Sequence, residues 1–436
     1  MSGMVLRGRE LGLLCITACL YLTGYAMLVI ERKDPLVPAT FVVPVGFLVL
    51  LLVVHLWLSV IGFRGDQFMF PTVSMLVGLS LLMVDRLRPS LLRSQLLWFA
   101  FGCLILVVIA TWGTDLLWLA RYKYTFAVAG MVLLLFTALF GHEINGARLW
   151  LRVGPFQFQT SEVMKLVLVV FMAAYLEEKG ELLSLATFQW RRLKLPPIAY
   201  LGPLLMMWVL SLLSLIWQRD LGGTLLLLGV ALAMMYVATG RRYYVVGGMA
   251  LFVFNLVVTY RLFGYVRNRI IIWLHPWEYA ADKSYQIVQA FYAMSSGGVL
   301  GSGLGQGAPK YIPEVHTDFI YAAIVEELGL LGGTAILALF LILIFRGLRT
   351  ALDMNGTFEK LLAVGFAAIL ALQALVIVGG NLSVIPLTGI TLPFVSYGGS
   401  SMVVNFIVVG LLLQLSAKPE RLLAARAALE PFPVGV

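Results

Sequence analysis

Long apolar runs recur along almost the whole chain, separated by short polar stretches. Each run has about 20 residues, the length that an α-helix needs to cross the ~30 Å hydrocarbon core of a bilayer. The runs lack the apolar–polar alternation of transmembrane strands, which argues against a β-barrel. The pattern predicts an all-α integral membrane protein with about 12 transmembrane helices, centred near residues 20, 50, 78, 104, 132, 169, 207, 231, 252, 332, 370 and 406.

Composition agrees with a membrane protein. Hydrophobic residues make up 61% of the 436 residues and charged residues 12%, whereas a soluble domain is near half apolar and a quarter charged. The first run ends in the charged residues 31–34 without a small-residue cleavage site, so we interpret it as a retained helix, not a signal peptide. Cys15, Cys19 and Cys103 lie in apolar runs and predict no disulfide framework.

The distribution of basic residues predicts the orientation. If the spans alternate from a cytoplasmic N-terminus, the inner loops hold most Lys and Arg side chains, although Arg86, Arg88 and Arg93 crowd one outer loop. The positive-inside rule therefore favours both termini in the cytoplasm. The net charge of +9 indicates contact with anionic lipid or orientation in the membrane, not nucleic-acid binding.

Two outer segments break the pattern of short loops. Residues 264–317 form a long connection between the ninth and tenth predicted helices, and residues 284–293 within it are predicted as a short interfacial helix. Long loops of this kind are often functional. Residues 380–401 are apolar but interrupted by Pro and Gly. Irregular backbone at membrane depth must be covered by protein or line a cavity, so we expect this segment to dip back and line a cleft.

The long loop contains two patterns that suggest ligand sites. GLGQGA at residues 303–308 fits a dinucleotide fingerprint formally, but no strand–helix context or later acid supports it, so we interpret it as a loop against a membrane helix. His275 and His316 lie among acidic residues, yet their spacing matches no zinc pattern. A Mg²⁺ or Mn²⁺ ion bound with a pyrophosphate stays open, and no cofactor is predicted with certainty.

The stretch PEVHTDFIYAAIVEELG, residues 313–329, is the strongest candidate for a site. Glu314, His316 and Asp318 stand where the chain enters an apolar helix. Asp318 is either an ordinary helix cap or a functional acid, because ionisable residues at membrane depth are functional candidates. Glu326 and Glu327 point about 100° apart on a helix, so they cannot face the same cavity, and at least one needs a basic partner or a helix end.

Three other polar groups have both a structural and a functional interpretation. Arg148 and Arg152 flank Trp150 and serve either as interfacial anchors or as contacts to an anionic head group. Glu162 and Lys165 are spaced to pair on one helix face, which favours a structural role. Asp220 either caps the next helix or pairs with an arginine across a cleft.

Motifs along residues 66–418 resemble the SEDS family (shape, elongation, division and sporulation), which includes FtsW, RodA and SpoVE. They are GARLW, SEVMK, QRDLGGT, YQIVQA, GSGLGQG, PEVHTDFIYAAIVEELG and PLTGITLPFVSYGGSS. The resemblance implies a membrane glycosyltransferase that polymerises the lipid-linked disaccharide-pentapeptide, lipid II, into peptidoglycan beside a class B penicillin-binding transpeptidase. The essential aspartate of the family falls on Asp318.

The chain also departs from the family pattern. Members usually have ten helices, so residues 1–65 are predicted as two extra N-terminal helices, residues 66–418 as the core with loop 264–317, and residues 419–436 as a cytoplasmic tail. Arg219 stands where Pro is usual, Lys310 where some members have an acid, and Leu387 where some have a lysine. The motifs do not separate a division member from an elongation member.

The resemblance implies roles for the polar residues. Asp318 is expected to act as general base in an inverting transfer that releases undecaprenyl pyrophosphate. Arg148, Lys310 and Arg219 rank first to stabilise the leaving group, with Arg152, Arg267, Arg269 and His316 as further candidates. Substrate contacts are expected from Glu314, His316, Ser396, Tyr397 and Ser400. Two rival functions remain open, a lipid II flippase and a non-catalytic scaffold that recruits a transpeptidase.

Overall fold

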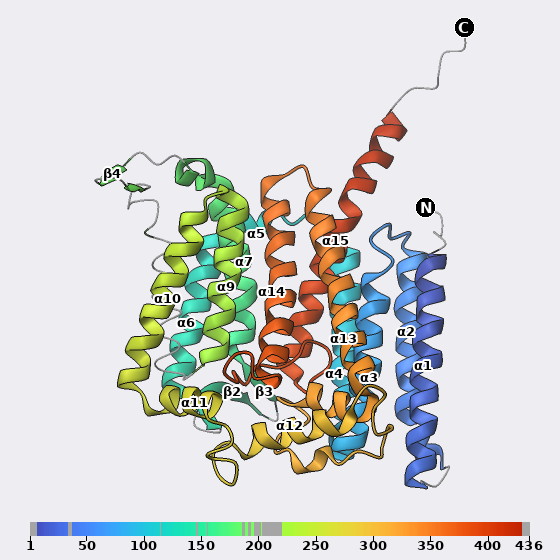
Figure 1. Cartoon of the computed structure of the whole chain (residues 1–436). Helices are drawn as coiled ribbons and strands as arrows, with labels where there is room; N and C mark the ends of the chain where they lie inside the picture. The colour runs from blue at the N-terminus through green and yellow to red at the C-terminus, as the bar shows by residue number, and fades with distance from the viewer. Residues whose placement is uncertain are drawn as a thin grey trace.

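The computed structural model describes residues 7–33, 37–113, 115–144, 147–154, 156–184, 188–190, 193–195, 202 and 220–429. Long helices dominate this part of the chain (Figure 1). They are α1 (Gly8–Arg32), α2 (Pro38–Val60), α3 (Met69–Leu87), α4 (Leu92–Trp112), α6 (Lys123–Phe140), α7 (Thr160–Ser184), α9 (Leu221–Thr239), α10 (Arg242–Leu262), α13 (Ile320–Leu352), α14 (Thr357–Asn381) and α15 (Gly399–Leu429). Shorter helices are η1 (Pro89–Leu91), α5 (Leu117–Arg121), α11 (Gly264–Leu274), α12 (Tyr285–Gly297) and η2 (Pro309–Tyr311).

The helices confirm the predicted all-α membrane class. Within the described ranges, 10 helices are long and apolar enough to cross a membrane, and they coincide with ten of the predicted centres. The centre near residue 169 falls in α7, whose 25 residues include several charged side chains. That helix packs against α6, α9 and α14. The centre near residue 207 lies outside the described residues.

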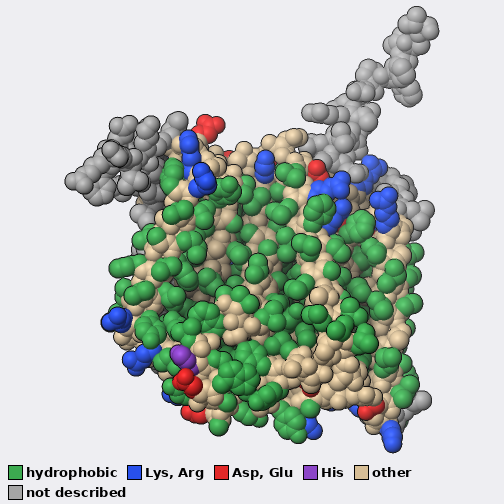
Figure 2. Space-filling model, viewed as in Figure 1, with side chains coloured by type: hydrophobic (Ala, Val, Ile, Leu, Met, Phe, Trp, Pro, Cys, Tyr) green, Lys and Arg blue, Asp and Glu red, His purple; other side chains and the backbone are tan. Residues whose placement is uncertain are grey.

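The outer surface of the bundle is suited to lipid. Figure 2 shows a broad hydrophobic band around the middle of one face, with Lys, Arg, Asp and Glu gathered towards its two ends. Side chains such as Phe254 and Leu341 are each 68% exposed, which would be costly in water but matches hydrocarbon. Charged groups at the ends of the band mark where the chain meets the interfaces.

Five short strands were not predicted. Strands β1 (His142–Ile144), β2 (Ala147–Val153) and β3 (Phe156–Gln159) form an antiparallel sheet between α6 and α7. Strands β4 (Phe188–Trp190) and β5 (Leu193–Leu195) form a hairpin. The stretch ARLWLRV in β2 alternates polar and apolar residues, a period-two signal that the neighbouring apolar runs overshadow.

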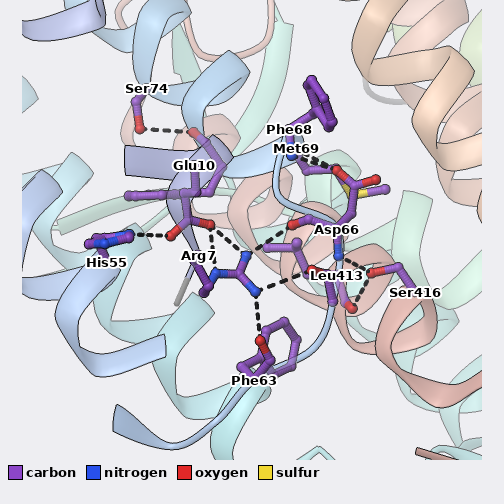
Figure 3. Close-up of polar contacts among 12 residues, drawn as sticks. Arg7, Glu10, His55, Phe63, Asp66, Phe68, Met69, Ser74, Leu413 and Ser416 are labelled. Carbon is purple, nitrogen blue, oxygen red and sulfur yellow. Dashed lines mark hydrogen bonds and ion pairs between the residues drawn. The ribbon is translucent and has the colours of Figure 1, made fainter. Parts of the chain in front are cut away.

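The two sides of the bundle differ in character. In Figure 1, α1 begins and α15 ends on the same side, whereas α11, α12, β2 and β3 lie on the opposite side. On the first side, a buried polar cluster joins the N-terminal helices to the rest of the bundle (Figure 3). The Arg7 guanidinium donates to the carbonyl oxygens of Phe63 at 2.7 Å and Gly65 at 3.1 Å, and it pairs with Glu10.

The same polar cluster extends to two later helices. The second carboxylate oxygen of Glu10 lies 2.8 Å from His55 Nδ1 on α2. Asp66, in the α2–α3 loop, forms an ion pair with Arg346 on α13, and its backbone amide lies 2.9 Å from the Ser416 hydroxyl on α15. Side chains from α1, α2, α13 and α15 therefore meet at one end of the bundle.

Candidate active site

Asp318 lies in a tight turn immediately before α13. Its amide donates to the Glu314 carbonyl oxygen at 3.2 Å, and Glu314 has a positive φ of 50°. The Asp318 side chain is half-buried. A Cβ placed on Gly389 would lie 3.7 Å from Asp318 Oδ2 and 3.9 Å from Arg269 Nη2. The turn therefore brings the carboxylate beside a guanidinium and a glycine backbone.

The backbone of this turn is held from the irregular segment 382–398. The Ser396 hydroxyl donates to the Thr317 carbonyl oxygen at 2.5 Å, and the Tyr397 amide donates to the His316 carbonyl oxygen at 2.9 Å. Leu392 and Phe394 in the same segment are almost fully buried. The expectation that protein covers this irregular backbone is confirmed, whereas its expected role in lining a cleft stays a prediction.

Asn381, which ends α14, was missed in the sequence and completes the support of Asp318. Its side-chain amide donates to the Asp318 carbonyl oxygen at 2.8 Å, and its carbonyl oxygen accepts from the Ala322 amide at 3.3 Å. The N-cap position of α13 is Phe319, which makes no side-chain cap hydrogen bond. Asn381 thus satisfies an amide of the first turn, so the interpretation of Asp318 as an ordinary cap is wrong. An Asn that ends a long apolar run was the available signal.

Arg269 on α11 is the cation that faces Asp318. Its Nη1 donates to the carbonyl oxygens of Leu387 at 3.1 Å and Thr388 at 2.9 Å, which fixes the guanidinium against the irregular segment. Its positive charge lowers the pKa values of both Asp318 and Asp220. Arg269 was only a further candidate in the sequence, yet it has the geometry expected of an anion-binding group.

Of the three cations ranked first, only Lys310 has a described side chain, and no contact between it and Asp318 is found among the described residues. Lys310 is exposed, and its ammonium lies 5.8 Å from the centre of the Tyr311 ring. The side chain of Arg148 and the whole of Arg219 lie outside the described residues. Arg152 is exposed and donates to the Gly154 carbonyl oxygen at 3.3 Å.

The surroundings of Asp318 change its acidity. Burial raises the pKa of Asp318 to about 6, opposed by a hydrogen bond from Thr317 and by the charge of Arg269, while the charge of Glu314 raises it. A carboxyl with such a pKa is still mostly ionised at pH 7 but is a stronger base than an exposed aspartate. This is the combination that a general base for a sugar hydroxyl requires.

His316 is buried beside this carboxyl. Burial lowers its pKa, and the charge of Arg88 acts in the same direction, whereas Glu314 raises it. His316 Nε2 lies 3.9 Å from Glu314 Oε2. The other ring nitrogen, Nδ1, is buried without a hydrogen-bond partner among the described residues. A neutral imidazole at this position is suited to hydrogen bonding and does not supply a fixed charge.

Asp220 caps α9. Its Oδ1 accepts from the Gly223 amide at 2.7 Å, which confirms the cap interpretation. Burial raises its pKa, while bonds from Gly223 and Ser161 and the charge of Arg269 lower it. Because Arg269 acts on Asp220 as well as on Asp318, the predicted partnership with an arginine across the site also has an electrostatic basis.

Glu162 and Lys165 form the predicted ion pair, with 2.7 Å between the ammonium and a carboxylate oxygen. Lys165 also donates to the side chain of Gln373 at 2.8 Å, and Gln373 donates to the Thr391 carbonyl oxygen at 2.9 Å. A chain of polar contacts thus runs from α7 through α14 to the irregular segment. This geometry favours the structural interpretation of the pair.

The hydroxyl groups expected to contact sugars have hydrogen-bond partners within the protein, and their contact with a sugar stays a prediction. Ser396 is buried and bonded to the Thr317 carbonyl oxygen. Ser400 Oγ lies 3.1 Å from the Gln159 amide and 3.3 Å from the Gln157 carbonyl oxygen, so it attaches β3 to α15. The hydroxyl of Tyr397 is hydrogen-bonded to the Ser94 side chain. These side chains position the backbone around the site.

The glycine-rich loop, which contains GLGQGA at residues 303–308, is bound to α13 by its backbone. The Ser302 and Gly303 amides donate to the carbonyl oxygens of Glu326 and Glu327, at 2.9 Å and 3.1 Å. Gly329 interrupts α13 with a φ of 70° and a ψ of −173°. This confirms a loop packed against a membrane helix, not a dinucleotide fingerprint.

The carboxylates of Glu326 and Glu327 hold the same loop. Glu326 Oε1 accepts from the Ala308 amide at 2.8 Å, and Glu327 Oε2 accepts from the Gly305 amide at 2.9 Å. Glu327 also pairs with Arg86 at 3.0 Å, as expected for at least one of the two acids. The expectation that the two side chains cannot face the same cavity stays a prediction, since their carboxylates bind two different amides of one loop.

The acidic and histidine residues of the long loop do not converge on a metal position. In the part of the chain that the structure describes, no group of three or more His, Cys, Asp and Glu side chains is arranged to hold an ion. His275 and Glu278 pair with each other at 3.2 Å on the surface. The predicted helix at residues 284–293 is confirmed as α12, which extends to Gly297.

Comparisons with known proteins agree with these features. The family model for FtsW, RodA and SpoVE, described as "Cell cycle protein", matches residues 48–421. The chain is 39% identical over 435 residues to the peptidoglycan glycosyltransferase RodA of Mycobacterium tuberculosis, covering 96% of this chain and 92% of that protein. It is 39% identical over 292 residues to the probable peptidoglycan glycosyltransferase FtsW of Geobacter sulfurreducens, covering 66% and 75%.

A solved structure, described as "Structural coordination of polymerization and crosslinking by a peptidoglycan synthase complex", contains a similar chain. That chain matches with a TM-score of 0.69 and 27% sequence identity. The match covers 82% of this chain and 98% of that one.

Proposed function

This chain belongs to the FtsW, RodA and SpoVE family, and on that premise we propose that Asp318 is the general base of its reaction. The protein is a multi-pass bacterial membrane glycosyltransferase that polymerises peptidoglycan in cell shape or division. The observation that carries the proposal is the Asp318 carboxylate, half-buried beside Arg269 with its pKa raised to about 6.

The proposed substrate is lipid II, and the reaction is a direct displacement. The hydroxyl oxygen of the acceptor sugar attacks the anomeric carbon of the donor while Asp318 takes the hydroxyl proton. The bond from that carbon to the pyrophosphate oxygen breaks, and undecaprenyl pyrophosphate departs with the electron pair. One displacement inverts the α-linked donor to a β-linked product, and a second carboxylate nucleophile is not needed. General-base catalysis of this kind contributes typically ~10²–10⁴-fold.

Arg269 is the proposed group that stabilises the departing pyrophosphate. A fixed guanidinium at the position where charge develops lowers the barrier more than a mobile surface cation does. The carbonyl contacts of Arg269 hold it in place. Mg²⁺ or Mn²⁺ bound with the pyrophosphate stays a prediction, and no step of this mechanism depends on one.

We further propose that the site faces the outer side of the cytoplasmic membrane and that both termini are cytoplasmic. The basic inner loops support this orientation. The similar chain comes from a peptidoglycan synthase complex that combines polymerization with crosslinking. This supports a transpeptidase partner, which we propose to be a class B penicillin-binding protein. The charges of Asp318, Arg269 and Asp220 gather at one end of the bundle, which favours an enzyme over a flippase with a polar path at mid-membrane.

The test is polymerisation by purified protein with lipid II as sole substrate. We expect Asp318→Asn to fold normally and to lose at least ~10²-fold in rate, the lower value for a lost general base. Asp282→Asn removes an equivalent charge from an exposed position of the same loop and should keep the wild-type rate. Equal rates for the Asp318→Asn and wild-type proteins would refute the assignment. Transbilayer movement of lipid II by the Asp318→Asn protein would favour the flippase function. Normal growth of cells that carry only the Asp318→Asn protein would favour the scaffold function.

A further inference from the structure

The N-terminal helices α1 and α2 reach the loops around the site. The family match begins at residue 48, within α2, so α1 stands outside it. We propose that α1 and α2 are a positioning element that braces two segments near the site, an inference that rests on the proposed function. One is the glycine-rich loop, which is bound to α13, and the other is the irregular segment 382–398, which holds the backbone just before Asp318. A pair of helices that only thickened the bundle would pack against other helices through apolar side chains and would leave those loops untouched.

The outer end of α1 packs directly on the glycine-rich loop. A Cβ placed on Gly305 would lie 3.1 Å from Glu31 Cγ and 3.5 Å from Leu28 Cδ2. One turn earlier, a Cβ on Gly24 would lie 3.6 Å from Leu304 Cδ2. Leu28 is fully buried. The close approach at Gly305 shows that the loop and α1 are in direct contact.

An ion pair reinforces this contact. Arg32, at the end of α1, donates to the Asp85 carbonyl oxygen at 2.6 Å and pairs with the Asp85 carboxylate at 3.3 Å. Arg86, which follows Asp85 in α3, binds Glu327 and the carbonyl oxygen of Gly307. Arg32 therefore fixes the backbone at the position from which Arg86 reaches the loop and α13.

A second route joins the N-terminal helices to the irregular segment through aromatic rings. Successive ring centres are 4.6, 5.5, 5.7 and 5.5 Å apart, within the range of favourable aromatic contacts. The rings belong, in this order, to Tyr21, Phe47, Phe99, Phe406 and Phe394. Phe394 has a φ of 65° and lies two residues before Ser396, which holds the Thr317 carbonyl oxygen.

The opposite end of α1 is fixed as well. The buried Arg7 guanidinium is bonded to the α2–α3 loop (Figure 3). Asp66 of that loop pairs with Arg346 on α13. With both ends held, α1 cannot tilt without breaking buried polar contacts, which are costly to leave unpaired. The helix is thus a rigid support between the two sides of the bundle.

The experiment compares two buried leucines on α1 with one lipid-facing residue. Leu28→Ala opens space beneath the glycine-rich loop. Leu14→Ala removes the same atoms near the other end of the helix, and both leucines are buried. Ile30→Ala changes a side chain that is 75% exposed. Steady-state polymerisation, its pH dependence, and hydrogen exchange of residues 303–308 are measured for the purified full-length proteins.

We expect Leu28→Ala to lower kcat about tenfold, within the effect of small misplacements of a catalytic group, with an unchanged KM. Since the glycine-rich loop and the Asp318 turn are both attached to α13, a shifted loop should also move the acidic limb of kcat. The amides of residues 303–308 should exchange faster. Leu14→Ala and Ile30→Ala should keep wild-type kcat and exchange in that loop.

Two further comparisons separate the possible failures. If the Leu28→Ala protein does not fold, Arg32→Gln and Arg32→Lys are measured in its place. Arg32→Lys keeps the positive charge and should therefore retain a higher kcat than Arg32→Gln. Identical kcat, pH profile and loop exchange in Leu28→Ala and Leu14→Ala would overturn the bracing. Absence of polymerisation by the wild-type protein would overturn the proposed function, whereas faster loop exchange confined to Leu28→Ala would still support the bracing.

Discussion

The residues around Asp318 divide into those that hold its backbone and the cation that faces its carboxylate. Ser396, Tyr397 and Asn381 bind carbonyl oxygens of residues 316–318, while Arg269 lowers the pKa of the carboxyl against the effect of burial. Because three hydrogen bonds from two segments fix the backbone, the carboxylate position is set before substrate arrives. Such preorganisation is a main source of catalytic rate.

Burial raises the pKa of Asp318 and the charge of Arg269 lowers it. These opposing effects predict how the polymerisation rate depends on pH. Asp318 acts as a base only when ionised, so kcat should fall about tenfold per pH unit below pH ~6. Arg269→Met removes the positive charge, which raises the Asp318 pKa and shifts the acidic limb to higher pH by roughly 1 unit. The pH profile of polymerisation checks this, with Arg267→Met at an exposed position as the control. An acidic limb at the same pH in Arg269→Met and wild type would refute the electrostatic effect of Arg269 on Asp318.

Asn381→Leu should weaken both stability and rate. Its loss leaves the Asp318 carbonyl oxygen and the Ala322 amide without this partner, at about 1–3 kcal/mol for a buried group. We expect a lower thermal unfolding midpoint in detergent and a kcat reduced about tenfold. Asn405→Leu removes a buried amide that donates to Ser401 and should affect the unfolding midpoint alone. Unchanged kcat in Asn381→Leu would contradict a positioning role.

Sequence alone identifies Asp318 because its motif is dense and specific. It misses Asn381, whose partner lies 63 residues earlier in the chain, since a contact over such a separation has no local pattern. The same limit applies to Ser396 and Ser400, which resemble sugar-binding hydroxyls in the sequence but bind backbone groups in the fold. Arg269 is only one of several further candidates in the sequence, because no periodicity tells which loop arginine turns towards the acid.

At the scale of elements, α13 and its preceding loop form one unit. The loop backbone pairs with α13 on both sides of Gly329: Leu330 donates to Gly298 at 3.0 Å and Gly303 to Glu327 at 3.1 Å. A Cβ placed on Gly329 would clash with the Val299 carbonyl oxygen. The helix therefore has to break where the loop crosses it, and only glycine fits there.

Gly329→Ala and Gly298→Ala test this reasoning as a matched pair. Both residues have positive φ, but a Cβ on Gly298 meets no atom within 4 Å. Gly298→Ala should cost only its sparsely populated backbone conformation, with a φ of 55° and a ψ of −141°, about 1–3 kcal/mol. Gly329→Ala adds a backbone clash and should lower the unfolding midpoint much further, as measured in detergent. Equal midpoints for the two variants would contradict the close crossing.

The secondary structure of this chain is predictable from sequence where a segment spans the membrane. Spans such as α2 and α14 follow from length and apolarity alone, because hydrocarbon leaves the backbone no alternative to a helix. Strands β1–β3 lie outside this constraint and depend on contacts such as that of Ser400 with β3. The apolar run near residue 169 predicts α7 as well, but its burial among α6, α9 and α14 is set by tertiary packing and has no signal in the sequence.

For the whole molecule, the proposed orientation can be tested at two exposed lysines, which the sequence-predicted topology places on opposite sides of the membrane. After Cys15, Cys19 and Cys103 are replaced by Ala, Lys310→Cys and Lys360→Cys each provide one reactive thiol at an exposed position. A membrane-impermeant maleimide should label Lys310→Cys in intact spheroplasts and Lys360→Cys only after permeabilisation. The reverse result would place Asp318 in the cytoplasm and exclude the proposed reaction.

The polar cluster around Arg7 has a consequence for biogenesis. Asp66 and its partner Arg346 are 280 residues apart, which a ribosome translates in roughly 15–55 s. During that interval the nascent protein carries an acid whose guanidinium has not yet been synthesised. Early helices therefore wait beside the insertion machinery for their last neighbours, and a chain truncated before α13 would expose a recognisable defect to quality-control proteases.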